Sequence, residues 1–542
     1  MEPMDEIAAG FHDAMGSRRK ILLIANLRRH RARNNDNHEP LKIASGCSGT
    51  DLFKFGLDAA NNYWKGNFNM EIEVDHVFSV DHDPGKQKWL LDHFSLSYLF
   101  KEMKEVAKGW AYDLRSKRYV HVPRSNLWIF GFECDSISSY NVNASENRCC
   151  AQDFSDKTGS SLGYALAYEE WGGPEWIIIE IVRNVFTKPK DGSSSVYEVI
   201  LALMNRRGIF ISPETLWAQK YGPANSRGRV WILCQKIATS AIDQTAKSFT
   251  PPGWAADASA MLKDLERPAL PLERFLVGPE DEERILNSGD PRFQPNKVAV
   301  PQAPANKKVK GEDYKAKHLE VFAAAEITWP PDWSSRPILR HRVRHLPERQ
   351  KEIVYFYTVV HERSAASAGV ETSHDINLNI TWGSDTADIV CCVATTSIIW
   401  LRLRERLLFG QEALALQGVG FEQQSRGSEQ YTQHEIFRLA GDAFNGFVAM
   451  AVLVTLFTVE GMVPKAFDQL GQPAVVLGKS SEVVGKSAEV VGKSAEVVPK
   501  SSGVAQASSG SQQEMTASDD AADSSSSAGL DTGDASSDSS SD

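Results

Sequence analysis

Two side chains capable of covalent and acid–base chemistry follow strongly apolar runs in this 542-residue chain. Cys134 comes just after WIFGFE, and Glu180 follows three consecutive isoleucines in WIIIEIV. A thiolate is a strong nucleophile, and a carboxyl group whose burial raises its pKa can hold a proton near neutral pH. The pattern therefore makes Cys134 a candidate nucleophile and marks Glu180 as a carboxylate whose burial is costly unless it serves a purpose. Each residue also fits a purely structural role, as a small buried thiol or as a strand-end carboxylate that reaches solvent.

A glycine-rich turn and a second strand-end acid precede these residues. The run LKIASGCSG predicts a strand that enters a turn, and DLFKFGLDAANNYW after it has the spacing of an amphipathic helix. Backbone N–H groups at such a turn can face a cofactor. Asp81 ends the next strand, where a carboxylate can accept hydrogen bonds from two ribose hydroxyls. Residues 41–237 contain no GxGxxG or Walker phosphate loop, which favours a nucleoside cofactor without a pyrophosphate, such as S-adenosylmethionine.

The elements that position these residues are apolar strands alternating with helical segments. Beyond the first strand, the strand-like runs are EVDHVFSVDHD, NLWIFGFEC, EWIIIEIV and RVWILCQ. This alternation predicts an α/β fold whose mostly parallel sheet is covered on both faces. Ligands of such sheets bind at the carboxyl ends of the strands, where Cys134 and Asp81 are expected.

The order of these features resembles the cytosine carbon-5 methyltransferases, over residues 41–237 and 395–460. ASGCSG is similar to the family's F-x-G-x-G cofactor loop, and GFECDSIS to the G-[FP]-P-C-Q loop that carries its nucleophile. EIVRNV is similar to E-N-V and NSRGR to Q-x-R-x-R, while RLRERLLFGQEALALQG and LAGDAF resemble the last two motifs. The resemblance implies a Rossmann-like S-adenosylmethionine-dependent methyltransferase fold with an inserted target-recognition domain.

The resemblance also implies roles for particular residues. The thiolate of Cys134 would add to carbon-6 of cytosine, and Glu180 would protonate ring nitrogen 3. Arg227 would neutralise charge on the carbonyl oxygen of the base, while Arg229 would brace the loop. The substrate would be DNA, from which the base must be flipped out, and neither a metal nor a membrane is expected as a partner. The implied cofactor-binding residues are Ser45, Gly46, Cys47, Ser48, Gly49, Asp81, His82 and Glu102.

Several positions depart from the family pattern. Glu133 stands where the family has proline, and its charge beside Cys134 works against thiolate formation. Asp442 replaces the asparagine of G-N-A. Two alternatives therefore stay open: the same chemistry on tRNA or another RNA, and a catalytically inactive relative that still binds nucleic acid. The other departures are Ala44, Ser48, Asp135, Ile181 and Asn225.

The chain divides into five segments by composition. We expect a basic flexible arm over 1–40, a catalytic domain over 41–237, an insert with a target-recognition role over 238–395 and the rest of the catalytic domain over 396–460. The last segment, over 461–542, is expected to be disordered, with heptapeptide repeats (GKSSEVV, GKSAEVV, GKSAEVV) and an acidic Ser/Asp-rich tail. Within the insert, EIVYFYTVV reads as a strand and five arginines suit phosphate contact. The segments SIIWLRLRERLLFGQEALALQGVG and YTQHEIFRLAGDAFNGFVAMAVLVTLFTV read as helix-rich. The five arginines are Arg336, Arg340, Arg342, Arg344 and Arg349.

Charge and cysteine content set the expected environment. The net charge is −11, but residues 501–542 hold eight acids and no Lys or Arg, so the remainder is at −3 and can still bind a polyanion. Seven cysteines without CxxC spacing indicate neither a disulfide framework nor a zinc knuckle. The apolar stretch over 447–459 is too short to span a bilayer and reads as a buried helix. We expect a soluble intracellular protein, located in the nucleus if its substrate is DNA.

Overall fold

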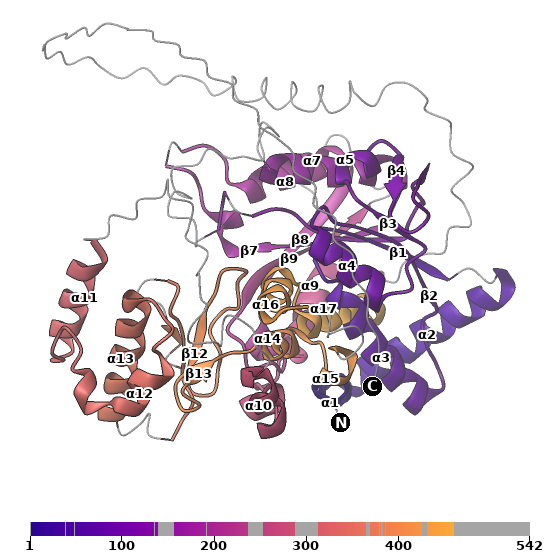
Figure 1. Ribbon diagram of the computed structural model, residues 1–542. Coiled ribbons are helices and arrows are strands. Elements are labelled where there is room, and N and C mark those ends of the chain that lie inside the picture. The colour runs from indigo at the N-terminus through magenta and orange to yellow at the C-terminus, as the bar shows by residue number, and fades with distance from the viewer. Residues whose placement is uncertain are drawn as a thin grey trace, which may run out of the picture. The chain divides into compact units, whose positions relative to one another are not determined.

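The structure is a computed structural model that describes most of residues 2–459 (Figure 1). The expected cofactor-binding residue Ser48 and the departure at Asp135 lie outside the described residues, as does the whole of 460–542 with its heptapeptide repeats and acidic end. The described ranges are 2–37, 40–47, 49–134, 136–138, 157–190, 192–236, 253–287, 313–364, 369–378, 380, 383–384, 386–424 and 431–459.

A nine-stranded sheet forms the centre of the described chain, in the order β5-β4-β3-β2-β1-β6-β7-β9-β8. The five strands from β3 to β7 in this order are parallel, and antiparallel pairs flank them on both sides. This confirms the predicted α/β fold with a mostly parallel sheet. The strands are β1 (Leu41–Gly46), β2 (Val74–Val80), β3 (Tyr98–Phe100), β4 (Trp110–Asp113), β5 (Arg118–His121), β6 (Leu127–Gly131), β7 (Trp176–Val182), β8 (Ile209–Trp217) and β9 (Gly228–Lys236).

Strand order reverses between β1 and β6. The chain runs outward from β1 through β2 to β5, and then returns to place β6 on the other side of β1. At such a reversal the connecting segments diverge and leave a crevice at the carboxyl ends of the strands. The loops that carry Cys47 and Cys134 leave the sheet at this point, which makes it the expected ligand-binding edge.

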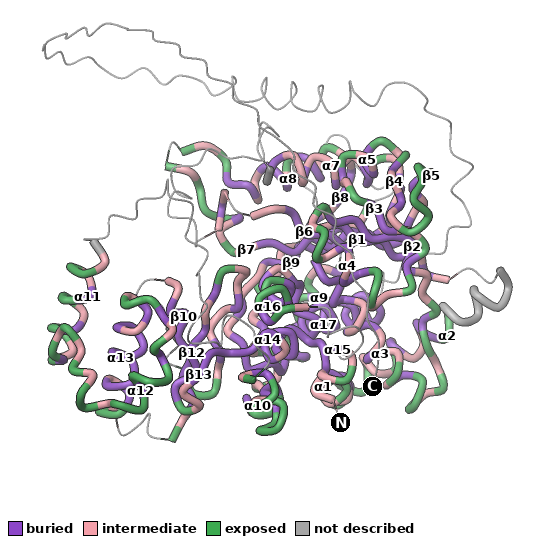
Figure 2. The backbone as a smooth tube through the Cα atoms, viewed as in Figure 1, coloured by how far each residue is buried: buried purple, intermediate pink, exposed green. Residues whose placement is uncertain are grey.

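Helices cover both faces of the sheet, because successive side chains of each strand point to opposite sides. In β7, Ile177 and Ile179 pack into one hydrophobic cluster, and Trp176 and Ile178 into the other. One face is covered by α5 (Met103–Val106), α7 (Lys157–Gly172) and α8 (Val196–Arg206). The other is covered by α3 (Leu52–Phe68), α9 (Gly253–Asp264), α16 (Gln433–Asp442) and α17 (Gly446–Thr458) (Figures 1 and 2).

Helix α17 is a core helix, as the sequence predicted. All 13 of its residues are buried, which explains why it is apolar on every side. Together with α16 it is long and apolar enough to cross a membrane by length and composition, yet 94% of its apolar window is buried inside the protein.

The N-terminal segment is not the flexible arm that its basic residues suggested. It forms α1 (Pro3–Ala14) and α2 (Ser17–Asn37), and α1 packs against α3 and α17. Ile7 and Phe11 are fully buried, and the Asn26 amide donates to the Phe457 carbonyl at 2.9 Å. The sequence signal for α1 is its apolar residues at helical spacing, Met4, Ile7, Ala8 and Phe11, which are buried on one face of the helix.

The insert is also divided differently from the prediction. Residues of α9 and of the 3-10 helix at Leu272–Phe275 pack into the main core, so the segment beginning at 238 does not form a separate body throughout. A distinct hydrophobic cluster extends from Phe322 to Leu407, beyond the expected end at 395. It involves α11 (Asp313–Ala324), α12 (Pro337–Arg342), α13 (Glu348–Arg363) and a small sheet of β11 (Gly383–Ser384), β10 (Ser373–Asp375), β12 (Ile399–Leu401) and β13 (Arg406–Leu407).

Two local predictions in this part of the chain were wrong. EIVYFYTVV forms α13, a helix buried on several sides, because tertiary packing overrides the β propensity of its valines and tyrosines. The run beginning SIIWLRLRERLL forms the hairpin of β12 and β13, and helix begins only with α14 (Gly410–Gln417). The remaining helices are α4 (Pro84–His93), α10 (Pro279–Asn287), α15 (Phe421–Gln424) and the 3-10 turns Arg183–Phe186, Ala218–Lys220 and Trp333–Ser335.

Candidate active site

The predicted nucleophile, acid and cofactor residues come together at the carboxyl edge of the parallel strands. Cys47 follows β1, Asp81 follows β2 and Cys134 follows β6, while Glu180 lies in the last half of β7. Glu180 pairs in register with Gly131 of β6, three residues before Cys134. The parallel pairing therefore brings these positions to one edge of the sheet, because strands that run in one direction end at one edge.

Glu180 is a buried acid with an arginine partner. It is 8% exposed, and its Oε1 lies 3.3 Å from Nε of Arg229. Burial raises its pKa, and the positive charges of Arg229 and Arg227 only partly oppose that shift. A carboxyl group in this setting can hold a proton at a higher pH than a solvated glutamate and deliver it to a bound base.

The two arginines exchange the roles that the resemblance implied. Arg227 is 4% exposed and donates to three backbone carbonyls, those of Val393 at 2.8 Å, Gly441 at 3.1 Å and Ala443 at 2.8 Å. It therefore ties the segment before β9 to the loops of the C-terminal part and is the bracing residue. Arg229, the second residue of β9, contacts Glu180 and is the arginine placed for chemistry.

The loop after β6 holds Cys134 in a turn. Its carbonyl accepts hydrogen bonds from the backbone N–H groups of Ile137 at 3.0 Å and Ser138 at 2.8 Å, so the chain bends directly after the thiol. The N–H of Glu133 donates to Ser161 Oγ at 3.2 Å. This contact with α7 supplies a positional constraint where the family has a stiff proline. Cys134 is half-buried, which is compatible with access to a substrate.

The cofactor end contains a partly buried cluster of two acids and a lysine. Asp81 is 2% exposed, and Lys86 Nζ lies 2.9 Å from Asp442 Oδ2 and 3.9 Å from Asp81 Oδ2. Burial raises the pKa of Asp81, and Lys86 opposes that shift. Burial alone would lower the pKa of Lys86, but Asp81 and Asp442 outweigh it and raise the pKa above its ordinary value. The lysine therefore stays charged between the two carboxyl groups.

The residues of this cluster fit a nucleoside diol. Oδ1 of Asp81 accepts the backbone N–H of Asp83 at 3.0 Å. Within the described part of the chain no N–H or O–H donates to Oδ2 of Asp81, so this oxygen has acceptor capacity for a hydroxyl. Gly49 adopts a left-handed backbone with φ +69°, and a Cβ there would lie 2.8 Å from the Asp442 carbonyl. The glycine turn thus lets the loop after β1 lie directly against the end of α16.

The other predicted cofactor residues do not all lie at the cofactor edge of the sheet. Ser45 lies within β1, fully buried, with its hydroxyl 3.0 Å from Ser79 Oγ, so its side chain braces the sheet and does not line the loop. Gly46 ends β1 against the Trp128 ring. Cys47 turns the chain at φ 48°, and burial raises the pKa of its thiol. His82 is exposed beside Asp81, 3.9 Å away, and Glu102 precedes α5 just beyond β3 at the same edge.

Lys86 was missed by the sequence analysis, although a signal was present. It lies in the first turn of α4, where the positive end of the helix dipole disfavours a cation. A lysine at such a position needs an external acidic partner. Asp51 was missed as well; it is fully buried, bonded to Ser79 Oγ and 3.6 Å from His76.

The arginines expected to contact phosphate separate into two groups. Arg336 is paired with Glu362, and Arg349 donates to the carbonyls of Leu378, Ile376 and Asn377, so both stabilise the fold. Arg340, Arg342 and Arg344 are exposed. Only this second group has the accessibility that the prediction requires.

Comparison with known proteins gives one match in sequence and distant likenesses in structure. No family model matches the chain. A DNA (cytosine-5-)-methyltransferase, DMT5, of Cryptococcus neoformans var. grubii is 22% identical over 440 residues, which cover 78% of this chain but only 17% of that relative. The chain thus spans about a sixth of the relative's length.

Two solved structures align with most of the chain at low similarity. The Dnmt2 methyltransferase of S. pombe is 14% identical and covers 77% of this chain and 98% of its own, with a TM-score of 0.39. A putative DNA modification methyltransferase encoded within a prophage of E. coli is 15% identical and covers 77% and 99%, with a TM-score of 0.41. These likenesses are too distant to bear on activity or substrate. In sequence, and in the order of the motif residues along one sheet edge, the chain is thus similar to cytosine carbon-5 methyltransferases.

Proposed function

We propose that the chain transfers a methyl group from S-adenosylmethionine to carbon-5 of cytosine in DNA. The observation that carries this proposal is the buried Glu180–Arg229 pair beside the strand that leads to Cys134. A nucleophile, a proton donor and a cation are the three groups that activation of the cytosine ring requires. Location in the nucleus follows from a DNA substrate and is part of the proposal.

The residues account for the chemistry in steps. The thiolate of Cys134 forms a bond to carbon-6, ring nitrogen 3 takes the proton held by Glu180, and Arg229 keeps that carboxyl group in position. The ring then carries electron density on carbon-5, which would bond to the methyl carbon as the bond from that carbon to the sulfonium sulfur breaks and a neutral thioether is left. A base removes the carbon-5 proton, the thiolate leaves carbon-6, and the proton on ring nitrogen 3 returns to Glu180, which restores the neutral aromatic ring. A stacked base cannot reach these groups, so the target must leave the duplex.

S-adenosylmethionine would supply the methyl group as a sulfonium substituent. Among the described residues, Asp81 would hold its ribose, and the turn of Cys47 and Gly49 would pass beneath it. Among the described residues, none donates a hydrogen bond to Oδ2 of Asp81, so this oxygen can accept one from a ribose hydroxyl. The sulfonium is a cation, which suits an edge where two carboxyl groups outnumber one lysine.

A second candidate function is a non-catalytic, nucleic-acid-binding relative. The carboxylate of Glu133 next to Cys134 favours it, because negative charge disfavours the thiolate. Oε1 of Glu133 lies 3.9 Å from His82 Nε2, so a protonated histidine would offset part of that charge. The RNA alternative differs only in substrate and is separated by the same experiment.

Covalent trapping tests the proposal. Protein and S-adenosylmethionine are incubated with 5-fluorocytosine-containing duplex DNA or tRNA, where fluorine prevents release of the adduct after methyl transfer. A denaturation-resistant band with DNA is expected, absent in Cys134→Ala and retained in Cys234→Ala, which removes a fully buried thiol of β9. A band with tRNA alone would transfer the proposal to RNA. No band from folded protein that binds DNA would support the non-catalytic relative.

A further inference from the structure

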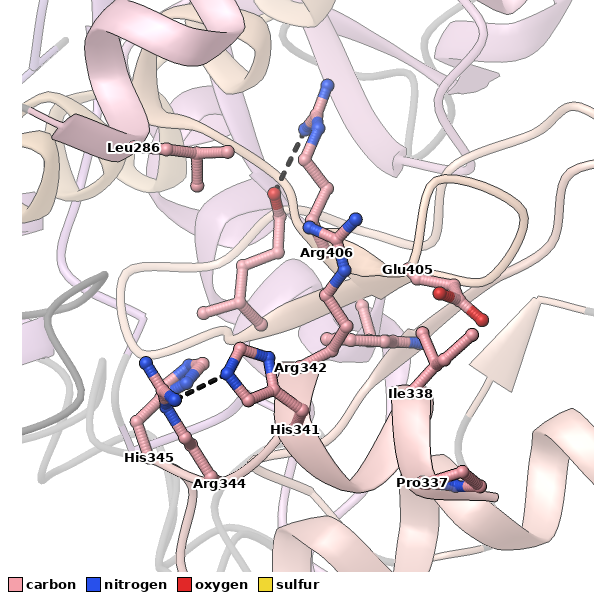
Figure 3. A pocket seen from close by; sticks show the side chains of 11 residues that line it. Leu286, Pro337, Ile338, His341, Arg342, Arg344, His345, Glu405 and Arg406 are labelled. Carbon is pink, nitrogen blue, oxygen red and sulfur yellow. Dashed lines mark hydrogen bonds between the residues drawn. The ribbon is translucent and has the colours of Figure 1, made fainter. Parts of the chain in front are cut away.

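A cavity of about 590 Å³ lies outside the candidate active site, between α10, α12 with the turn after it, and the hairpin of β12 and β13 (Figure 3). This volume is within the range of small-molecule sites. None of its lining residues belongs to the carboxyl edge of the large sheet. We propose that this cavity binds the phosphate group of a nucleotide.

Basic side chains line the cavity. They include Arg342 and Arg344, and Arg344 donates to Nε2 of His341, which therefore acts as an acceptor. His345 also lines the cavity, and burial together with the charge of Arg344 lowers its pKa. Within the described part of the chain, neither Arg342 nor Arg344 has an acidic partner. Arg406 also lines the cavity, but Glu412 and Glu282 neutralise it, so it adds no net charge. Two uncompensated guanidinium groups attract an oxyanion and present planar pairs of donors to it.

Two buried polar atoms of the lining residues have no hydrogen-bond partner among the described residues. Trp400 is 2% exposed, and its indole Nε1 has no hydrogen-bond acceptor among the described residues. Nε2 of His345 is likewise buried without a partner there. An indole N–H can only donate, and a buried donor without an acceptor costs free energy. A ligand rich in acceptor oxygens would satisfy it.

The rest of the cavity indicates that the phosphate carries an organic group. Leu286, Ile338 and Leu407 line it, and the Ile338 side chain is 69% exposed, so a ligand could cover it. Glu405 also lines the cavity, and Figure 3 shows it apart from Arg344 and His345. A carboxylate there repels a phosphate but accepts hydrogen bonds from hydroxyl or amino groups. A nucleoside supplies both an apolar surface and such donors.

The choice of a nucleotide rests on the proposed function, whereas the attraction of an oxyanion does not. The phosphate could belong to a free nucleotide or to a strand bound by the chain, and the chemistry of recognition is the same. The cavity lies outside the site proposed to bind and methylate cytosine. If the nucleotide proposal failed, the result of covalent trapping at Cys134 would therefore be unaffected.

Calorimetric titration of the full chain with thymidine 5′-monophosphate tests the proposal. This probe avoids both the cytosine and the adenosine sites, and thymidine, inorganic phosphate and phosphoserine are the comparison ligands. The variants are Arg342→Gln and Arg344→Gln. The matched control is Arg340→Gln, because Arg340 is exposed on the same helix but does not line the cavity. A short DNA duplex added as competitor distinguishes the two sources of phosphate.

The monophosphate is expected to bind, and thymidine is not. Each cavity variant should weaken binding about tenfold, as expected for the loss of one charge-assisted contact, while the control should match the unmodified chain. Displacement by the duplex would assign the site to a strand, and no displacement to a free nucleotide. Equal binding by all variants, or no binding of the monophosphate, would overturn the proposal. Phosphoserine or inorganic phosphate binding as tightly as the nucleotide would overturn its nucleotide part.

Discussion

The candidate active site has a cofactor end around Asp81 and a catalytic end around Cys134, and each end contains a residue that departs from the family pattern. The two departures differ in whether their charge is balanced. At the cofactor end, Asp442 replaces an asparagine, and Lys86 pairs with it at 2.9 Å. At the catalytic end, Glu133 replaces a proline, and its Oε1 lies 3.9 Å from Nε2 of His82, a side chain that is 58% exposed. The first departure adds a negative and a positive charge together. The second adds a negative charge that only a protonated surface histidine would balance.

This difference shows that a changed motif residue has to be judged with its spatial partner. The Lys86–Asp442 pair leaves the net charge around Asp81 as it would be with a neutral asparagine and no lysine. The Lys86–Asp442 pair is also partly buried. Replacing only one of its two residues therefore leaves the charge of the other uncompensated in a poorly solvated site. The catalytic end retains Cys134, Glu180 and Arg229 but gains a charge beside its nucleophile. Four predictions test this comparison.

Glu180→Gln is expected to have the largest effect and to show that the catalytic end works as an acid site. Glutamine keeps the shape but cannot deliver a proton, so the single-turnover methylation rate should fall about 10²- to 10⁴-fold. Because burial raises the pKa of Glu180, the wild-type rate should fall as pH rises through that raised pKa, and the variant should lack this limb. Glu214→Gln, in β8, is the control. A variant as fast as the wild type would exclude Glu180 as the proton donor.

Arg227→Met and Arg229→Met should separate bracing from chemistry. Loss of Arg227 leaves three backbone carbonyls without their donor, so the free energy of unfolding should fall by about 3 kcal/mol, measured by urea denaturation. Arg229→Met should change that free energy by less than about 1 kcal/mol and lower the methylation rate about tenfold or more. The reverse result would restore the roles implied by the family resemblance.

Lys86→Met and Asp442→Asn should each weaken S-adenosylmethionine binding, and together they should restore it. The first leaves two neighbouring carboxyl groups, and the second turns Lys86 towards Asp81 alone. Each is expected to cost about tenfold in affinity, or about 1.4 kcal/mol, so full restoration in the double variant corresponds to a coupling of about 2.8 kcal/mol, measured by calorimetry. Lys88→Met, on the same helix, is the matched control. Additive losses would mean that the two residues do not compensate each other.

Glu133→Gln is expected to give the smallest effect and to show that the catalytic end carries an unbalanced charge. Two unit charges 4 Å apart in water interact by about 1 kcal/mol, so removing one should favour the thiolate and raise the alkylation rate of Cys134 about fivefold. Iodoacetamide labelling followed by peptide mass spectrometry measures this rate. No change would indicate that His82 or solvent already balances the charge.

The sequence alone determined the sheet and the positions of the reactive residues along it. Apolar runs of strand length, alternating with amphipathic segments, report burial on one or two faces, and this periodicity is local. Cys134, Glu180 and Asp81 could be placed at the carboxyl edge because parallel strands end together. The buried character of α17 was also predictable, since an apolar run too short for a bilayer has to be covered by protein.

Only the tertiary structure decided which partner each polar group meets. Arg227 and Arg229 are two residues apart, yet one reaches carbonyls more than 160 residues away and the other reaches Glu180 on the neighbouring strand. The partner of Lys86 likewise lies in α16, and the burial of EIVYFYTVV makes it a helix. Hydrogen bonds and ion pairs act over a few ångströms in space, and a single sequence does not record which distant segments the fold brings within that distance.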